Sequence, residues 1–238
     1  GDLNPKLTWE TSCLATMRLA DKASFYGIER FIYASSGSVY GVKDEDCVTE
    51  ELSLDPISEY NKTKMVSERV LLSYGDKMII QVVRPATVCG LSPRMRLDVS
   101  VNMLTMQALT NGKITVFGGT QVRPNIHIDD VCNLNLFLLE NPQINGGYNA
   151  GFENLTILDI AHMVKKLVAC DIEVTEITDK RSYRLDSTKL LKTGFTPRKT
   201  VNDAISEIIE AHSAGQLDDN DQHHNLVWMK KRGFAEGE

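Results

Sequence analysis

A tyrosine and a lysine four residues apart form the most informative pair in this sequence. They are the first and last residues of the run Tyr60-Asn61-Lys62-Thr63-Lys64. Residues four apart share one face of an α-helix, so the phenol and the ammonium can act on the same ligand. A phenol titrates near pH ~10, and a neighbouring cation favours its anionic form. The pair therefore predicts an acid–base device for carbonyl–alcohol chemistry; the alternative is a solvated helix face on which the spacing arose by chance.

A serine-rich stretch precedes this pair and offers hydroxyl groups for the same chemistry. The stretch reads Tyr33-Ala34-Ser35-Ser36-Gly37-Ser38-Val39-Tyr40-Gly41. A short apolar strand leads into it, so the serines are expected at a strand end, beside the Tyr60–Lys64 helix. A serine hydrolase is excluded, because Ser38 directly follows Gly37 and the GxSxG spacing is absent.

The elements that must position these residues alternate between helices and strands. Apolar spacing predicts helices over residues 3–26, 58–74, 99–109, 129–139, 156–168 and 201–211, and strands over 31–34, 78–83, 114–117, 126–128, 148–150 and 172–177. Gly27 fits the end of the first helix and Ser58 the start of the second. Residues 42–57 read as an acidic loop, and the tail from Gly215 as polar. The alternation predicts an α/β fold with a parallel sheet and right-handed crossovers.

Composition limits the class of protein. The chain has 238 residues, 42% of them hydrophobic and 24% charged, with a net charge of −6. These values are typical of a globular protein and argue against a nucleic-acid partner, which favours a basic surface. No apolar run is long enough for a membrane span. Five dispersed cysteines without a CxxC pair predict free thiols, no metal site and a cytoplasmic location.

Five sequence blocks, in order, resemble the extended short-chain dehydrogenase/reductases, specifically the nucleotide-sugar epimerase and dehydratase group. The blocks are Ala34–Gly41, the Tyr60-x-x-x-Lys64 helix, Arg84–Gly90, Arg123–Asp130 and, more weakly, Arg181–Asp186. The resemblance implies a Rossmann-like, doubly wound parallel sheet with a smaller C-terminal α/β substrate-binding domain. It places the remainder of the dinucleotide-binding domain at residues 1–90 and about 124–150, and the substrate domain at residues 91–123 and 151–238.

The resemblance also implies roles for individual residues. Tyr60 would be the general acid/base, Lys64 would hold the nicotinamide ribose of NAD and lower the pKa of Tyr60, and Ser36 would bind the reacting sugar hydroxyl. Ser35 and Pro85 would join Tyr60 and Lys64 around the cofactor. Residues expected to contact the nucleotide sugar are Ser36, Ser38, Thr87, Asn102, Val116, Phe117, Arg123 and Arg181.

Arginine forks suit the phosphate oxygens of such a substrate, which favours Arg123 and Arg181; a surface or structural role is the alternative for each. For Arg84, structural pairing and ligand contact are both open. His127 is expected to be structural, and the His223–His224 pair has no acidic partners at metal-ligand spacing.

Several departures from the family pattern bear on cofactor and substrate. The GxxGxxG loop that cradles the NAD pyrophosphate is absent from this sequence. We therefore expect a chain truncated at its N-terminus by roughly 70 residues, at ~30 per βαβ unit, that binds NAD poorly as given. Ser12 and Thr87 stand where many relatives have Asn, which weakens one cofactor contact and one substrate contact.

The serine block discriminates among activities within the family. Dehydratases of this group carry an Asp-Glu pair where this chain has Gly37 and Ser38. Neither residue can remove a proton as a carboxylate does, so elimination of water is disfavoured. The prediction is an NAD-dependent epimerase of a nucleotide sugar, acting at C4 through a transient keto sugar.

Two alternatives to this epimerase stay open. One is a reductase or dehydrogenase with the same Ser/Tyr/Lys set, and the other is a non-catalytic binding protein or inactive fragment. Relatives dimerise through the helices that correspond to residues 7–26 and 58–74, which predicts a homodimer. The sequence leaves the sugar, the nucleotide, and the choice between NAD and NADP undetermined.

Overall fold

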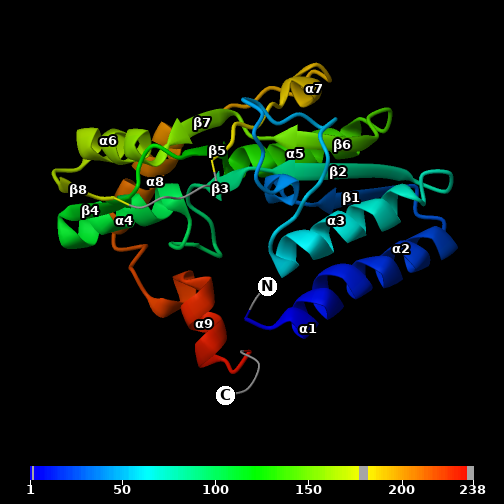
Figure 1. Ribbon diagram of the computed structural model, residues 1–238, viewed down its shortest axis with the longest axis horizontal. Coiled ribbons are helices and arrows are strands. Elements are labelled where there is room, and N and C mark those ends of the chain that lie inside the picture. The colour runs from blue at the N-terminus through cyan, green and yellow to red at the C-terminus, as the bar shows by residue number, and fades with distance from the viewer. Residues whose placement is uncertain (2, 177–181, 235–238) are drawn as a thin grey trace.

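The computed structural model describes residues 1, 3–176 and 182–234. Its first sheet consists of β1 (Arg30–Ala34), β2 (Ile79–Pro85) and β6 (Gly146–Ala150), in the order β1-β2-β6. All three strands are parallel, with Ile32 opposite Gln81 and Val83 opposite Tyr148. Parallel pairing requires crossover connections, and helices supply them. The predicted α/β class is confirmed (Figure 1).

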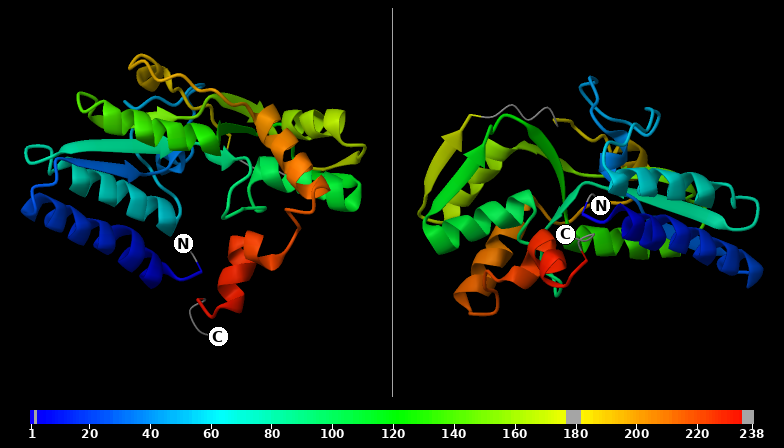
Figure 2. Two further views of the ribbon diagram at one scale, coloured as in Figure 1. Left: turned by 180° about the vertical axis from the view of Figure 1, so that it is seen from behind. Right: turned by 60° about the horizontal axis from the view of Figure 1, so that its bottom comes forward.

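Helices cover both faces of this sheet. Ile80 and Val82 of β2 pack with Ala20 of α2 (Ala15–Phe25) and Leu71 of α3 (Glu59–Leu72). Val83 points to the other face, where α5 (Ile128–Glu140) packs. The opposite placement of α5 relative to α2 and α3 is visible in Figure 2. The continuous apolar run in β2 therefore reflects burial on both faces, as in doubly wound sheets.

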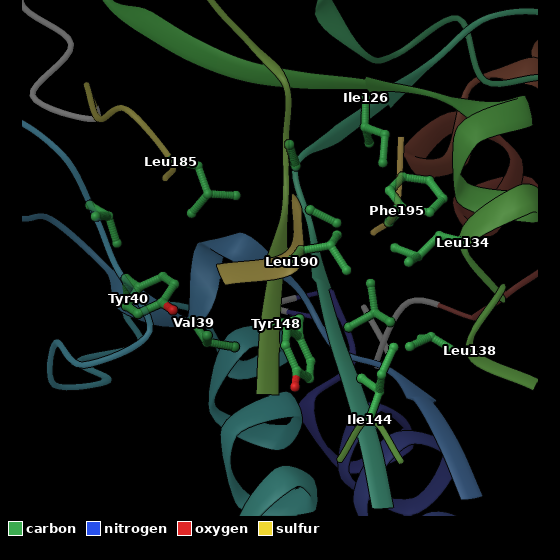
Figure 3. Close-up of a cluster of buried hydrophobic side chains, with 14 residues drawn as sticks. Val39, Tyr40, Ile126, Leu134, Leu138, Ile144, Tyr148, Leu185, Leu190 and Phe195 are labelled. Carbon is green, nitrogen blue, oxygen red and sulfur yellow. The ribbon is translucent and has the colours of Figure 1, made fainter. Parts of the chain in front are cut away.

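The larger of the cores lies on the α5 side of the sheet. Figure 3 shows its side chains converging from β2, β5, β6, α5, the serine turn and the segment around α7 (Thr188–Leu191). Val48, from the predicted loop 42–57, is fully buried here and forms a β-bridge with Leu185. That stretch is therefore not a simple surface loop, because residues distant in sequence recruit it into the core.

The second half of the chain builds a smaller α/β unit. β3 (Thr87–Cys89) pairs in parallel with β5 (Val122–His127), which pairs antiparallel with β7 (Glu153–Thr156). β4 (Lys113–Phe117) pairs in parallel with β8 (Asp171–Thr175). The helices α4 (Ser100–Asn111), α6 (Ile157–Leu167) and α8 (Val201–Ser213) pack around a second apolar cluster, which they share. The exact domain limits given from the sequence stay a prediction.

Sequence signals locate the helix ends well. Ser58 caps α3 by accepting a hydrogen bond from the Asn61 amide, and Thr156 and Thr200 begin α6 and α8 with capping boxes. Gly27 follows the first helical segment with φ of +68°. That segment is not one uniform helix: a π-helical stretch, Trp9–Leu14, separates α1 (Pro5–Thr8) from α2.

The polar tail also forms structure. After a 3₁₀ turn at Asp221–His223, the chain makes α9 (Asn225–Lys231). Figure 1 shows α9 (red) on the same side of the molecule as the N-terminus. The side-chain Nδ2 of Asn4 donates to the Phe234 carbonyl over 3.1 Å. Within the described ranges, no helix combines the length and apolarity needed to cross a bilayer.

Candidate active site

A cavity of about 780 Å³ opens where the carboxyl ends of β1, β2 and β3 meet the loop 91–99 and α9. Seven of the residues predicted from the sequence line it: Ser35, Ser36, Ser38, Tyr60, Pro85, Thr87 and Asn102. Ligands of parallel α/β sheets bind at this edge because the strands end there together. The fold therefore gathers most of the predicted site into one place.

The serine turn is held rigidly at the end of β1. The Ser35 amide donates to the Val83 carbonyl over 2.7 Å, and Ser36 caps the 3₁₀ turn Gly37–Tyr40 by accepting from the Ser38 amide over 3.2 Å. Ser35 is only 3% exposed, and its Oγ has no hydrogen-bond partner among the described residues. A buried hydroxyl of this kind normally has a hydrogen-bond partner, so it is available to a water or a ligand that enters the cavity.

The hydroxyls of Ser36 and Ser38 belong to a hydrogen-bond chain that ends on α3. Ser38 Oγ donates to Asn61 Oδ1 over 2.6 Å, and the two serine oxygens lie 2.7 Å apart. Each hydroxyl has one proton, so Ser36 donates to Ser38. Ser36 is left with an oxygen lone pair to accept a hydrogen bond from a substrate hydroxyl. Asn61 was not among the residues predicted for the site, although it directly follows Tyr60 in the motif.

Tyr60 and Lys64 lie together on α3, as their spacing predicts. Lys64 Nζ is 5.6 Å from the centroid of the Tyr60 ring and donates to the Ala34 carbonyl over 2.8 Å. This bond ties the lysine to the end of β1. Burial lowers the pKa of Lys64, and the nearby Glu68 carboxylate opposes that shift. The cation is thus anchored between strand and helix, beside the phenol.

The predicted direction of the pKa shift of Tyr60 is wrong. Lys64 was expected to lower it, but burial among the cavity walls raises the pKa of Tyr60, and the charge that opposes this rise is Arg96. Tyr60 keeps 40% of its surface exposed. Because Tyr60 lines the cavity and is partly withdrawn from water, its anion is less favoured.

Loop 91–99 supplies cavity residues that the sequence analysis left unassigned. Arg96 pairs with Asp98 over 2.9 Å. Arg94 donates to Asn225 Oδ1 over 2.8 Å and stacks on Trp228, with its Cζ 5.9 Å from the ring centroid. All but Trp228 line the cavity. The sequence feature that could have identified these cavity residues is the presence of two arginines in one short loop after a strand, since such cations commonly face anionic ligands.

Asn102 has a different role from the one expected. Its side chain is 2% exposed and accepts from the Gly90 amide over 3.0 Å. Its Nδ2 donates to the carbonyls of Gly90 and Arg96 over 3.4 and 2.9 Å. Both donors are therefore committed to the backbone, and Asn102 fixes the loop rather than offering a free donor to a phosphate.

The predicted nucleotide-binding residues do not join the rest at this cavity. Val116 is fully buried in the apolar cluster between α4, α6 and α8, so its side chain presents no surface to a ligand. Phe117 is 52% exposed, and Arg123 Nη1 donates to the Val122 carbonyl over 3.1 Å; neither lines this cavity. Arg181 lies outside the described residues. Contact of these residues with a nucleotide stays a prediction.

Arg84 and His127 are structural in their contacts. Arg84 forms a buried ion pair with Glu68 over 2.7 Å. His127 Nδ1 accepts from the Asp129 amide over 3.1 Å, so its Nε2 carries the hydrogen and donates to Glu207 over 3.1 Å. His127, Asp129 and Glu207 are close enough to be considered as metal ligands. Both ring nitrogens already form hydrogen bonds, however, and these bonds account for the proximity of the three residues without a metal.

Comparison with known proteins agrees with this geometry. The model of the NAD dependent epimerase/dehydratase family matches residues 2–151. An uncharacterized UDP-glucose epimerase of Bacillus subtilis, YtcB, is 32% identical over 158 residues, which cover 64% of this chain and 49% of that protein. The chain thus spans about half the length of this relative.

Solved structures of similar fold include complexes with NAD. MoeE5 in complex with UDP-glucose and NAD superposes with a TM-score of 0.75 at 27% identity, over 90% of this chain and 77% of that one. UDP-glucuronic acid 4-epimerase from Bacillus cereus, with UDP-glucuronic acid and NAD, gives a TM-score of 0.72 at 28% identity, over 84% and 67%. The expected Rossmann-like fold is confirmed.

Proposed function

Because the chain belongs to the NAD-dependent epimerase/dehydratase family, we propose that it provides the catalytic residues of a nucleotide-sugar epimerase that inverts C4. The observation that carries this proposal is the shared cavity: Ser36, Ser38 and Tyr60 line it together, while Gly37 and Ser38 supply no carboxylate. Removal of water needs a group that takes a carbon-bound proton. Inversion through a keto sugar needs only an acid–base group at the oxygen.

The residues present fit the nicotinamide half of NAD. The Ser35 hydroxyl has no partner among the residues that the structure describes, and both Ser35 and Pro85 line the cavity. Lys64 lies beside Tyr60, where its ammonium can reach a ribose hydroxyl. The sequence contains no GxxGxxG, so the amide cradle for the pyrophosphate has no counterpart in these residues. When bound, NAD accepts a hydride from the sugar carbon and returns it.

The protein residues manage the proton. Tyr60, as phenolate, takes the proton of the sugar hydroxyl at its Oη, while Ser36, whose own proton is committed to Ser38, accepts a hydrogen bond from an adjacent sugar hydroxyl. Ser36 cannot pass a proton further, because its chain ends on the Asn61 amide, which does not titrate. The proton therefore returns from Tyr60 when the keto sugar is reduced from its other face.

The test is a product assay on the chain, and on the same chain with any residues that precede Gly1 in its gene. Each is incubated with NAD and a panel of UDP-, GDP- and dTDP-sugars, and products are identified by NMR. We expect a C4-inverted sugar without net NADH formation, and none with Tyr60→Phe. A 4-keto-6-deoxy product would show a dehydratase, and stoichiometric NADH a dehydrogenase. Absence of NAD binding by calorimetry in both forms would leave a non-catalytic binding protein.

We propose that the protein is a homodimer through the two neighbouring helices of residues 7–26 and 58–74. Leu14, Met17, Leu19 and Leu72 expose apolar side chains on them, at 45%, 39%, 61% and 44%. Exposed apolar side chains on neighbouring helices are the kind of surface that an interface covers. Sedimentation should give twice the monomer mass, and Leu19→Glu should give a monomer, whereas Leu167→Glu, on the distant α6, should leave the dimer intact. A wild-type monomer would contradict the proposal.

A further inference from the structure

Tyr33 is the penultimate residue of β1, and its side chain points to the face of the sheet that α2 and α3 cover. It is 7% exposed and packs in one core cluster with Ala20 of α2 and Leu71 of α3. Ile32, its neighbour on the strand, packs on the opposite face with the larger core. The ring of Tyr33 is thus fixed between strand and helices, and the proposed chemistry has so far given it no role.

The ammonium of Lys64 lies over this ring. Lys64 Nζ is 4.9 Å from the centroid of the Tyr33 ring and 5.6 Å from that of the Tyr60 ring. Both distances fall within the ~6 Å over which an aromatic face attracts a cation. Ala34, directly after Tyr33, accepts a hydrogen bond from Lys64 Nζ over 2.8 Å. The end of β1 therefore supplies two contacts to the lysine, a carbonyl oxygen and a ring face.

The carboxylate whose charge acts on Lys64 is already engaged by another cation. Glu68 opposes the burial that lowers the pKa of Lys64, but Arg84 binds its carboxylate over 2.7 Å in a buried ion pair. Lys64 itself is half-buried, so its ammonium has lost part of its hydration. The carbonyl oxygen and the two ring faces compensate for that loss and fix the place of the charge.

Tyr33 suits this role because its contact with the cation is not a strong directional bond. Burial raises the pKa of Tyr33, so the phenol is neutral at neutral pH and attracts Lys64 through its ring face. An ammonium has three N–H donors, and the Ala34 carbonyl takes one of them. A carboxylate in place of the ring would compete for the other two donors. With the ring there, they stay available to the hydroxyls of a ligand.

We propose that Tyr33 is a positioning residue of the site, whose ring face, with that of Tyr60, holds the Lys64 ammonium at the end of β1, where the ribose hydroxyls of NAD would bind. The inference rests on the proposed function, because it takes Lys64 as the residue that holds the ribose. Tyr33 itself contacts neither cofactor nor sugar in this arrangement and acts only through Lys64.

The experiment measures how fast Lys64 is acetylated, by mass spectrometry, at a pH below the pKa of the lysine, where the rate follows the uncharged fraction of the amine. Tyr33→Phe is compared with the same variant carrying 3,4,5-trifluorophenylalanine at position 33. Fluorine withdraws electron density from the ring face with little change of shape, so the attraction for the cation falls while the packing is kept. The rate at Lys64 should rise about two- to fivefold in the fluorinated protein.

Tyr148 provides the matched control, because its ring lies 4.8 Å from Lys189 Nζ and belongs to the larger core. The same pair of variants at position 148 should leave the acetylation of Lys64 unchanged. Tyr33→Leu removes the ring altogether and frees the ammonium to move. In the form of the chain that binds NAD, it should weaken NAD binding about two- to fivefold in calorimetry, whereas Tyr33→Phe should bind NAD as the wild type does.

The results separate this inference from the proposed function. Equal acetylation of Lys64 in Tyr33→Phe and its fluorinated counterpart overturns the inference, and the proposed function stands if the chain still forms the C4-inverted sugar. A similar rise at Lys64 in the position-148 pair shows a general effect of fluorination and also overturns it. A wild-type chain that binds no NAD in either form overturns the proposed function, and the positioning role of Tyr33 with it.

Discussion

Glu68 and Arg84 form a buried, bidentate ion pair between α3 and β2. Arg84 Nη2 donates to Glu68 Oε2 over 2.7 Å, and Arg84 Nε donates to Oε1 over 3.1 Å. Arg84 Nη1 also donates to the Tyr40 hydroxyl over 2.6 Å, and that hydroxyl donates to Asn149 over 2.7 Å. One network thus connects the helix of Tyr60 and Lys64 with the end of the serine turn.

Removing one partner of this ion pair should be costly. Glu68 is 1% exposed and Arg84 is 7% exposed, so Glu68→Gln leaves a buried guanidinium without its counter-charge. We expect a loss of about 3–5 kcal/mol in the free energy of unfolding, measured by urea denaturation. The double variant Glu68→Leu with Arg84→Met removes both charges and should lose less than Glu68→Gln. Equal or additive losses would contradict a coupled pair.

The acid limb of the pH–activity profile should depend on Arg96. Because Arg96 opposes the burial that raises the pKa of Tyr60, Arg96→Gln should raise that pKa further. The phenolate that takes the sugar proton then forms only at higher pH, so the midpoint of kcat/KM moves to alkaline pH. Arg94→Gln removes the other arginine of loop 91–99 that lines the cavity, which contacts Asn225 and Trp228, and is the control.

Ultraviolet titration of the Arg96→Gln variant, referenced to Tyr60→Phe, checks the same pKa without turnover. An unchanged tyrosinate midpoint in Arg96→Gln would show that Arg96 does not act on Tyr60.

Asn61 should control the direction of the serine hydrogen bonds. Asn61→Leu removes the acceptor of the Ser38 hydroxyl, and Ser38 is then free to donate to Ser36. We expect kcat to fall about three- to tenfold with little change in KM, which corresponds to one hydrogen bond of ~1 kcal/mol. Asn61→Asp keeps an acceptor oxygen and should retain most activity. Wild-type kcat in Asn61→Leu would refute the assignment.

The position of α9 should depend on Asn225. Its amide donates to Asp98 over 3.1 Å, and its side chain accepts from Arg94. Asn225→Ala removes the second bond, so hydrogen exchange in residues 225–231 should accelerate about three- to tenfold. Gln222→Ala, on the exposed turn before the helix, should leave exchange unchanged. Because Leu226 and Met229 line the cavity, KM for the nucleotide sugar should rise only in Asn225→Ala.

The sequence by itself determined the local features of this protein. The apolar run of β2, the helix starts at Ser58 and Thr156, and the Tyr60–Lys64 spacing depend on neighbours within a few residues, and each occurs as predicted. The ordered blocks also predicted the family and the fold. These signals are readable because helix and strand periodicity is a property of the chain, whatever lies around it.

Only the tertiary structure decided which side chains share the cavity and what charge acts on Tyr60. Asn102 turned inward to the loop backbone, Val116 became core, and Arg96 and α9 came to the site from segments without a motif. A pKa depends on burial and on charges brought near by the fold, and neither can be read from sequence distance. For the same reason Tyr183, almost 150 positions from Ser36 in sequence, lines the same cavity only in the folded chain.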